Sequence, residues 1–513
     1  MKLNYKRTIC VGFAFFLICA FWQAYDNIVP LMLTNKFGMS QAHSGIIMAI
    51  DNILALFMLP LFGIISDKTN SKLGKRTPYI LVGTIIAVIA FVGLTFADNM
   101  QLAKINAVSA IDDKAALETL YEFDYGTELI APDGESFNVK DKFTKNEFTA
   151  ITSVDENGQT NPDYTNYVEP ARQAYVHQQT LSDPQPIIIF IAILLVALIA
   201  MATFRSPAVA LMPDVTIKPL RSKANAVINL MGTAGGICVL ALGAVFATGS
   251  VKNSMMNYTV FFSVIAGLMV AALIVFMLTV REPKFVSEMQ EESKKYNIDE
   301  SAEDENGNKR KLSKGEFFSL ILILASVIFW FMGYNAVTSK YSVYASKVLN
   351  LDYNMTLMLA QAAAIVAYIP VGLISSKIGR KKAILAGVVM LCTAFSVAAT
   401  LTAGSSPIIM NCMFALAGIG WATINVNSFP MVVELAKGGD VGKYTGFYYT
   451  ASMAAQTITP YISGLLMDNY GMRTLFPYAA VFVALAFITM IFVKHGDSKP
   501  IGKASLEALD VDA

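Results

Sequence analysis

The stretch "GIISDKTNSKLGKRTPYI" (63–80) decides the fold. It ends one long apolar run and begins another, and the short loop between the runs carries several Lys and Arg residues. A spanning α-helix needs about 20 mostly apolar residues, and runs of that kind recur along this chain. Because short loops rich in Lys and Arg lie on the cytoplasmic side of a membrane, the stretch predicts two spanning helices joined by a cytoplasmic loop.

The composition agrees with a membrane protein. The chain has 513 residues, of which 55% are hydrophobic and 15% are charged, whereas soluble domains carry about 25% charged residues. A transmembrane barrel would show short alternating segments instead of long apolar runs. The net charge is +1 and no basic stripe is present, so we expect no nucleic-acid partner. The predicted fold class is an all-α polytopic membrane protein in contact with the lipid bilayer.

Twelve spanning helices are expected. They lie near residues 8–33, 42–65, 78–97, 187–213, 221–248, 257–281, 316–348, 355–376, 383–402, 407–433, 443–468 and 474–493. With the N-terminus inside, the short inner loops carry 13 Lys or Arg residues and the short outer loops carry 3. This bias predicts that both termini are cytoplasmic, in a multi-pass protein of the cell membrane.

The spans divide into two halves. Residues 1–281 are expected to form an N-terminal six-helix bundle, and residues 316–494 a C-terminal one. The charged segment 282–315 is poor in apolar residues and predicts a flexible cytoplasmic linker. Residues 495–513 are a cytoplasmic tail, and residues 98–186 are an extracytoplasmic insertion between spans three and four.

The insertion is acidic, with 16 Asp or Glu against 6 Lys or Arg. Its stretch "DDKAALETLYEF" (112–123) predicts a short helix. Its stretch "GTELIAPDGESFNVK" (126–140) predicts a hairpin, because two alternating runs flank a Pro-Asp-Gly turn. We expect a small α+β cap, with a disordered acidic loop as the alternative.

The chain also contains an internal repeat. "GLISSKIGRKKAI" (372–384) ends span eight and begins span nine, as 63–80 does for spans two and three. Both segments read Gly-x-Ile-Ser, a polar link, Gly, basic residues and then an apolar run. Six spans followed by six spans, with matched elements in each half, are typical of two-half transporters.

These motifs resemble the major facilitator superfamily. The loop at 63–76 is similar to its signature loop, and 372–382 to the weaker second copy. The variant "SD…GKRTPYI" resembles the glycoside–pentoside–hexuronide:cation symporters and the plant sucrose–proton symporters, as does the segment 205–236. The resemblance implies a secondary active transporter that imports a sugar or glycoside of the di- or oligosaccharide class by cation symport. H⁺ is the expected cation and Na⁺ the alternative.

Charged residues within spans are the candidates for ion coupling, since such charges normally face a cavity or a partner. Asp26 lies in span one and Asp51 lies near the middle of span two. Arg205 in span four is a candidate counter-charge for either acid. The resemblance makes Asp214 a coupling or sugar-binding acid; from the residues alone it is equally a loop acid paired with Arg221. The alternative role for the two acids is a structural hydrogen bond between helices.

Polar and aromatic side chains inside the spans are the candidate substrate ligands. Amides and carboxylates bind sugar hydroxyls, and aromatic faces cover sugar rings. The candidates are Trp22, Gln23, Asp26, Asn27, Asn225, Asn229, Trp330, Tyr334, Asn335, Thr338, Gln361, Trp421, Asn425, Tyr448 and Gln456. Interhelical hydrogen bonding is the alternative role for many of them.

The two repeated loops are the candidate cytoplasmic gate. Its expected residues are Asp67, Lys75, Arg76, Arg380 and Lys381. No Walker A sequence supports ATP-driven transport, and no catalytic constellation points to an enzyme. The three histidines are far apart in the sequence and the five cysteines have no metal-ligand spacing, so we expect no cofactor or metal.

Two other functions remain open at this stage. One is an exporter of drugs or metabolites with the same fold, although span five lacks the Gly-Pro pair common in such exporters. The other is a sensor that does not transport and uses the insertion as a sugar receptor. We expect a monomer.

Overall fold

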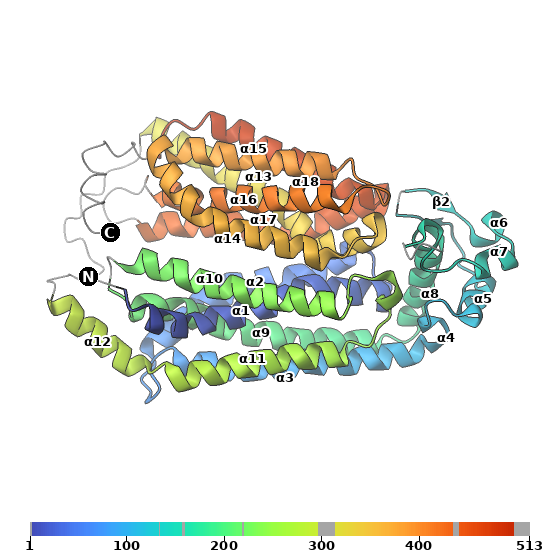
Figure 1. Cartoon of the computed structure of the whole chain (residues 1–513), viewed down its shortest axis with the longest axis horizontal. Coiled ribbons are helices and arrows are strands. Elements are labelled where there is room, and N and C mark those ends of the chain that lie inside the picture. Colours follow the sequence, from blue (N-terminus) through green and yellow to red (C-terminus); the bar gives the residue numbers. More distant parts are fainter. Residues whose placement is uncertain are drawn as a thin grey trace. The chain divides into compact units, whose positions relative to one another are not determined.

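Long helices make up most of the chain in its computed structural model (Figure 1). The structure describes residues 3–132, 134–155, 160–217, 220–295, 313–433, 435 and 441–496. The long helices in these ranges are α1 (Tyr5–Leu31), α2 (Gln41–Lys68), α3 (Thr77–Lys104), α9 (Gln185–Asp214), α10 (Arg221–Val245), α11 (Thr259–Thr279), α13 (Lys314–Tyr344), α14 (Tyr353–Ile378), α15 (Arg380–Ala398), α16 (Pro407–Val433), α17 (Val441–Tyr470) and α18 (Leu475–Ile491). Each of the twelve expected spans coincides with one of them, which confirms the predicted fold class.

Ten helices in the described residues are long and apolar enough to cross a membrane by length and composition. The other two long helices are α14 and α17. Many Tyr, Ser, Thr and Gln residues lie along α17, and these lower its mean hydropathy. Proline occurs inside several of the long helices, for example Pro30 in α1 and Pro60 in α2, as spanning helices tolerate.

The first helix of each half ends in the same unusual way. A five-residue π-helical turn continues α1 (Met32–Lys36), and another continues α13 (Ala345–Leu349). Each turn carries one buried lysine, Lys36 in the first and Lys347 in the second. The structural repeat therefore extends beyond the basic loops seen in the sequence.

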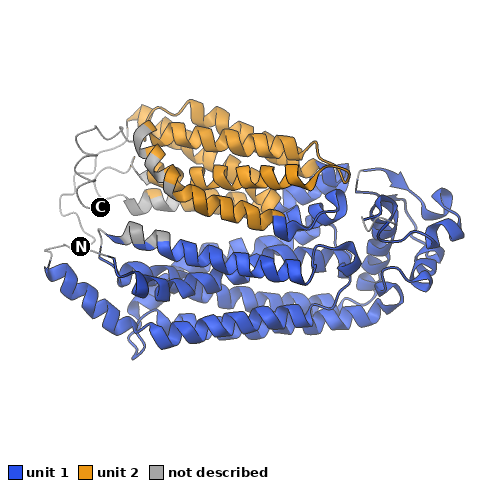
Figure 2. Ribbon diagram, in the orientation of Figure 1, with its two compact units in different colours: residues 1–301, 339–355, 460–473 blue, residues 302–338, 356–459, 474–513 orange. Residues whose placement is uncertain are grey.

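The chain separates into two compact units (Figure 2). Unit 1 contains residues 1–301, 339–355 and 460–473, and unit 2 contains the remainder. In unit 1, α1 packs on α10 and α3 packs on α9, while in unit 2, α15 packs on α16 and α18. Unit 1 thus contains the N-terminal bundle together with the ends of α13 and α17 and their adjoining turns.

The insertion between α3 and α9 is a folded α+β cap, and the membrane end that carries it is named here the cap end. Its elements are α4 (Asn106–Ser109), α5 (Lys114–Glu122), β1 (Leu129–Ile130), β2 (Ser136–Phe137), α6 (Val139–Lys142), α7 (Lys145–Thr149), η2 (Tyr164–Val168) and α8 (Glu169–Ser182). The predicted helix at 112–123 and the predicted hairpin are both present, with Leu129 paired to Phe137 across two antiparallel strands. The alternative of a disordered loop is wrong for the described residues.

The cap has a hydrophobic core of its own. Leu120, Phe137, Phe148, Tyr164 and Val168 are among its buried side chains. The same cluster includes two residues of the loop that joins α10 to α11, so the core continues into the cap end of the N-terminal bundle. A fold with a continuous buried core of this kind holds its surface groups in fixed positions.

The first part of the segment expected to be a flexible linker is helical instead. Residues Glu282–Lys295 form the helix α12. Residues 296–312, the middle of that linker, lie outside the described residues, and so does the tail from residue 497.

Candidate functional site

Three charged side chains from three spans of unit 1 form the central cluster. Asp26 of α1 interacts electrostatically with Asp51 of α2 and with Arg205 of α9. All three residues are only partly buried. The side-chain amide of Asn52 donates a hydrogen bond of 2.8 Å to Asp51. The structure therefore brings together the two acids and the basic residue that the sequence proposed as their counter-charge.

Trp22 extends the charged cluster along α1. The Arg205 guanidinium carbon lies 5.6 Å from the centre of the Trp22 ring, within range of a cation–π interaction. The Trp22 Nε1 and the Asn27 Nδ2 are buried, and neither has a hydrogen-bond partner among the described residues. A buried donor without a partner costs about 1–3 kcal/mol, so these two donors are suited to a ligand that supplies acceptors.

Unit 2 contains a separate aromatic cluster. The rings of Tyr334 of α13 and Trp421 of α16 are parallel, with centroids 3.6 Å apart. Phe331 packs edge-on against Trp421 at 5.2 Å. Trp330 is fully buried. A flat pair of aromatic rings with an intermediate exposure at Trp421 is a surface on which a sugar ring can stack.

Several other predicted ligands bond to their own helices. Asn335 donates to the Phe331 carbonyl at 2.8 Å, and Gln456 donates to the Ser452 carbonyl at 3.3 Å. Thr338 does the same one turn back on α13. These contacts occupy one donor of each side chain within its own helix, whereas the alternative considered from the sequence was hydrogen bonding between helices.

The remaining predicted ligands differ in their exposure. Gln23, Gln361 and Asn425 are partly buried, Asn229 is exposed, and the hydroxyl of Tyr448 lies 3.0 Å from that of Ser428. The side chains of Arg221 and Asn225 lie outside the described residues.

Arg76 organises the loop between α2 and α3. Its Nε donates to Asp214 at 2.8 Å, and its Nη1 donates to Ser66 at 2.5 Å. Its Nη2 forms an ion pair with Asp67. Asp214 therefore lies with the gate residues at the end of the helices that is remote from the cap. Of the two sequence-based roles for Asp214, the loop acid matches this position, although its observed partner is Arg76.

Glu282 is a member of this network that the sequence analysis missed. Its carboxylate accepts hydrogen bonds from the backbone N–H groups of Lys75, Arg76 and Thr77, and from the Thr77 hydroxyl. The carboxylate thereby accepts from the backbone N–H groups at the N-terminus of α3, where a negative charge is favoured. The only signal in the sequence was an acid directly after a spanning run, which does not identify a partner about 200 residues away.

The basic residues of the second copy of the loop also form hydrogen bonds to other segments. In unit 2, Arg380 donates to the Pro430 carbonyl at 3.3 Å, and Lys381 donates to the carbonyls of Ile491 and Val493, each at 2.7 Å. Both basic residues of the second copy thus bond to backbone carbonyls of neighbouring helices or of the segment after α18.

A further network joins helix ends at the cap end of unit 1. Asp468 of α17 accepts hydrogen bonds from the backbone N–H groups of Gln41 and Ala42, at 2.8 and 2.7 Å. The buried Lys340 of α13 donates to the Gln41 carbonyl at 2.5 Å. A side chain at Gly464 would begin 2.3 Å from that carbonyl oxygen. The first turn of α2 is thus held by two helices of the C-terminal half.

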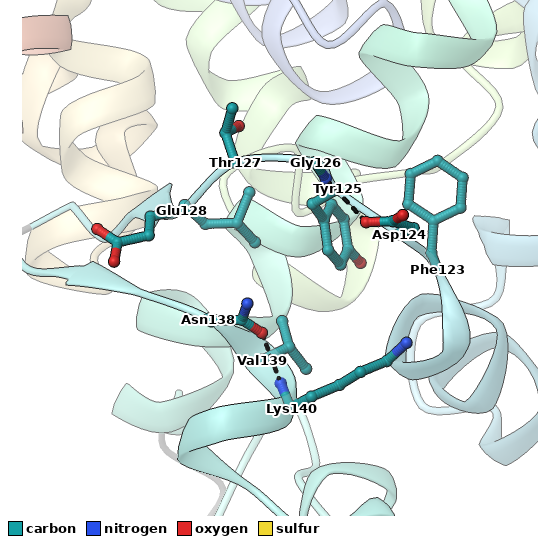
Figure 3. Close-up of a pocket in the computed structure, with 10 residues that line it drawn as sticks. Phe123, Asp124, Tyr125, Gly126, Thr127, Glu128, Asn138, Val139 and Lys140 are labelled. Carbon is teal, nitrogen blue, oxygen red and sulfur yellow. Dashed lines mark hydrogen bonds between the residues drawn. The ribbon is translucent and has the colours of Figure 1, made fainter.

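The cap also has a surface cavity of about 370 Å³, shown in Figure 3. Asp124 accepts a hydrogen bond from the Gly126 N–H, and Asn138 accepts one from the Lys140 N–H. The Lys140 amine donates to the Glu122 carbonyl. Because these polar groups serve the loop itself, the charged cluster of unit 1 is the stronger candidate for the transport site.

The sequence profile of the Major Facilitator Superfamily matches residues 179–439 and 354–509, more than half of the chain. The chain belongs to the major facilitator superfamily. A second profile, described as MFS/sugar transport protein, matches residues 10–118. No curated protein sequence matches significantly. The chain is therefore a major facilitator secondary transporter and not an enzyme.

Solved structures of several transporters share this fold. The xylose transporter XylE from E. coli in an inward-open conformation matches with a TM-score of 0.59 at 12% identity, over 99% of this chain and 100% of the transporter. A bacterial homologue of the iron transporter ferroportin matches with a TM-score of 0.59 at 13% identity, over 96% of this chain and 99% of that protein. The peptide transporter POT matches with a TM-score of 0.56 at 10% identity, over 95% of this chain and 94% of that transporter. These proteins are named for different substrates, so the likeness establishes the fold alone.

Proposed function

We propose that this transporter imports a sugar or glycoside, of the di- or oligosaccharide class, together with a proton by alternating access. The observation that carries the proposal is the cluster of Asp26, Asp51 and Arg205 within the spans of unit 1. Charged side chains at this depth are costly unless they serve a pathway or a partner. A protein that only needed to be stable would not keep three of them together.

The charge balance of the cluster suits a symporter. With both acids ionised and the guanidinium protonated, the three side chains carry a net charge of −1. One bound proton makes the cluster neutral, and a neutral cluster is cheaper to enclose in a low-dielectric interior. The proton-loaded form is then the one that changes conformation with substrate bound. A sodium ion would neutralise the cluster equally, and the experiment below separates the two ions.

Each unit by itself offers groups suited to binding a sugar. In unit 1, Trp22 Nε1 and Asn27 Nδ2 have no hydrogen-bond partner among the described residues and would donate hydrogen bonds to sugar oxygens. In unit 2, the apolar face of a sugar ring would pack on the stacked rings of Tyr334 and Trp421. The sugar-transport profile supports this substrate class, because its matched range 10–118 contains Asp26 and Asp51.

The remaining features follow from the same proposal. The bias of Lys and Arg toward the inner loops supports cytoplasmic termini, and the proposed transporter is a monomer in the plasma membrane. The Asp67–Arg76–Asp214 network lies within the N-terminal half, where it holds the ends of α2, α3 and α9 together as one side of the proposed cytoplasmic gate. Reciprocal coupling means that sugar and proton each raise the affinity for the other.

Uptake into proteoliposomes tests the proposal. A panel of mono-, di- and oligosaccharides is offered with a pH gradient and a sodium gradient imposed separately. We expect one saccharide to accumulate with the pH gradient alone. Accumulation only with sodium would replace the proton by Na⁺, and accumulation of none of the saccharides under either gradient would overturn the substrate class.

The variant Asp51→Asn tests the coupling role. The amide mimics a permanently protonated acid, so gradient-driven accumulation should fall by about 100-fold while exchange of substrate across the membrane persists. Asp141→Asn, an exposed acid of the cap, is the matched control and should transport normally. Undiminished accumulation by Asp51→Asn would remove this acid from the coupling mechanism.

A further inference from the structure

The cap contacts helix ends from both halves of the chain at the cap end of unit 1. The cap is covalently part of the N-terminal half, because it joins α3 to α9. Three of its contacts lie on other segments: the turn between α1 and α2, the π-helical turn that ends α13, and the turn between α17 and α18. The last two segments belong to helices of the C-terminal half.

The first contact is a close backbone packing of α8 against the turn after α1. Gly38 adopts a φ of +65°, and a Cβ added there would lie 2.4 Å from the His177 N and 2.6 Å from the Gln173 O. The Gln173 amide also donates to the Met39 carbonyl at 3.0 Å. Only glycine allows this approach, so α8 is fixed on the N-terminal bundle.

The second contact buries charged groups between α8 and the end of α13. Lys347 is 6% exposed and donates to the Gln173 side-chain oxygen at 3.2 Å. Glu169 is 8% exposed, and its Oε2 has no hydrogen-bond partner among the described residues. Electrostatic attraction to Lys347 and Arg172 offsets part of the cost of burying its charge. Gln173 therefore bonds to both halves of the chain, through its amide nitrogen and its oxygen.

The third contact joins the cap hairpin to the turn after α17. The Met472 N–H donates to the Pro132 carbonyl at 2.9 Å. A Cβ at Gly134 would lie 3.4 Å from the Tyr470 carbonyl oxygen, in ordinary van der Waals contact. This turn directly follows Asp468, which holds the first turn of α2.

Opening of a major facilitator transporter at the cap end requires the ends of its two halves to separate. Every one of these contacts between the cap and α13 or the α17–α18 turn would then break. We propose that the cap is a lock that holds the cap end closed, and that the buried charges of Glu169 and Lys347 are its latch. The lock goes beyond the proposed function, because it acts whichever substrate or ion is carried.

The latch makes a specific prediction about single and double substitutions. Removing one partner of a buried charge pair leaves the other charge uncompensated, whereas replacing both with neutral groups is often tolerated. Glu169→Gln leaves Lys347 without its acid, and Lys347→Met leaves Glu169 without its nearest cation of the C-terminal half. Each single variant should therefore weaken the closed state, and the double variant should restore it.

The experiment measures opening directly by thiol labelling. Ser44 is fully buried and lies three residues after Gln41, on the same face of α2. Ser44→Cys is made in a full-length chain lacking the five native cysteines and is reconstituted in lipid nanodiscs, where a hydrophilic maleimide reaches both faces. The labelling rate then reports opening at the cap end without any substrate.

We expect Glu169→Gln and Lys347→Met each to raise the labelling rate by about tenfold or more, and the double variant to label within about threefold of the parent. The matched control Lys142→Met removes an exposed ion pair with Glu135 inside the cap and should label at the parental rate. If one single variant does not fold, Gln173→Leu replaces it and should also label faster. Parental labelling rates in the variants that fold would overturn the lock, as would a double variant that opens as readily as the single variants.

Discussion

Lys36 and Lys347 occupy the same place in the two halves of the molecule, yet they are compensated in different ways. Each is the buried lysine of a π-helical turn that ends the first helix of its half. Lys36 donates to both carboxylate oxygens of Asp98 at 2.7 Å. Lys347 donates a hydrogen bond of 3.2 Å to the side-chain oxygen of Gln173 and is attracted by the more distant charge of Glu169.

The surroundings of Lys36 complete its compensation. It also donates to the Met256 carbonyl at 2.6 Å, and its ammonium group lies 4.3 Å from the centre of the Tyr258 ring. All these partners belong to the N-terminal bundle, whereas the partners of Lys347 belong to the cap. A lysine at a repeated position can therefore form a permanent ion pair within one half of the molecule, while its counterpart forms a contact that breaks when the two halves separate.

The largest effect is expected from breaking the permanent pair. Asp98→Asn leaves the fully buried Lys36 without its carboxylate, so the protein should lose about 3–5 kcal/mol of unfolding free energy. The double variant Asp98→Asn with Lys36→Met should recover most of this loss. Unfolding in mixed micelles measures both values, and equal destabilisation of the single and double variants would contradict the pairing.

A smaller loss of stability is expected at the separable contact. Lys347→Met removes one hydrogen bond to a neutral group and the attraction to Glu169, which keeps Arg172 as a second cation. The unfolding free energy should therefore fall by about 1–2 kcal/mol, with the main effect on opening at the cap end. The same unfolding measurement checks this value. A loss as large as that of Asp98→Asn would mean that Lys347 is a permanent structural residue like Lys36.

The pH dependence of stability sharpens the comparison further. Burial raises the pKa of the Glu169 carboxyl above its ordinary value, against the opposing effects of Lys347 and Arg172; Tyr164 also faces it. The folded cap therefore binds this proton more tightly than the unfolded chain does. Its contribution to stability is greatest at low pH and is lost as the pH rises from the usual glutamate pKa of about 4.3 through the raised value.

Glu169→Gln should remove this component of the pH profile. Thermal unfolding between acidic and neutral pH, compared between the parent and the variant, isolates it from the other carboxyl groups. The parent should lose more stability than the variant as the pH rises. Parallel profiles would show that Glu169 does not change its protonation on folding.

The smallest effect is expected for an exposed pair of the cap. The Lys142 amine lies 2.8 Å from the Glu135 carboxylate and 4.1 Å from the Tyr167 ring centre. Water and salt screen such a contact, so Lys142→Met should leave both unfolding and maleimide labelling unchanged. A measurable change in either would show that surface charge of the cap, rather than its buried charge, controls the lock.

The sequence predicted the features that depend on local patterns. Apolar runs of sufficient length predicted the twelve long helices, and the Pro-Asp-Gly turn between alternating runs predicted the cap hairpin around Leu129 and Phe137. The basic loop at 63–80 predicted the superfamily. The proximity of Arg205 to Asp26 and Asp51 was proposed because a charge inside a span requires compensation.

The features that the sequence analysis missed depend on contacts between distant segments. Glu282, Asp468 and Glu169 each act on a partner more than 170 positions away in the chain. A charge near an apolar run signals that a partner exists, but several groups of either sign are available. The choice among them is made by the packing of the helices, which no local pattern records.

The attachment of the cap has a practical consequence. Lys104, at the end of α3, forms an ion pair with Asp183, directly before α9, and these two helices pack against each other. The points where the chain leaves and rejoins the helical bundle are therefore neighbours, so the length of the segment between them can change without moving α3 away from α9.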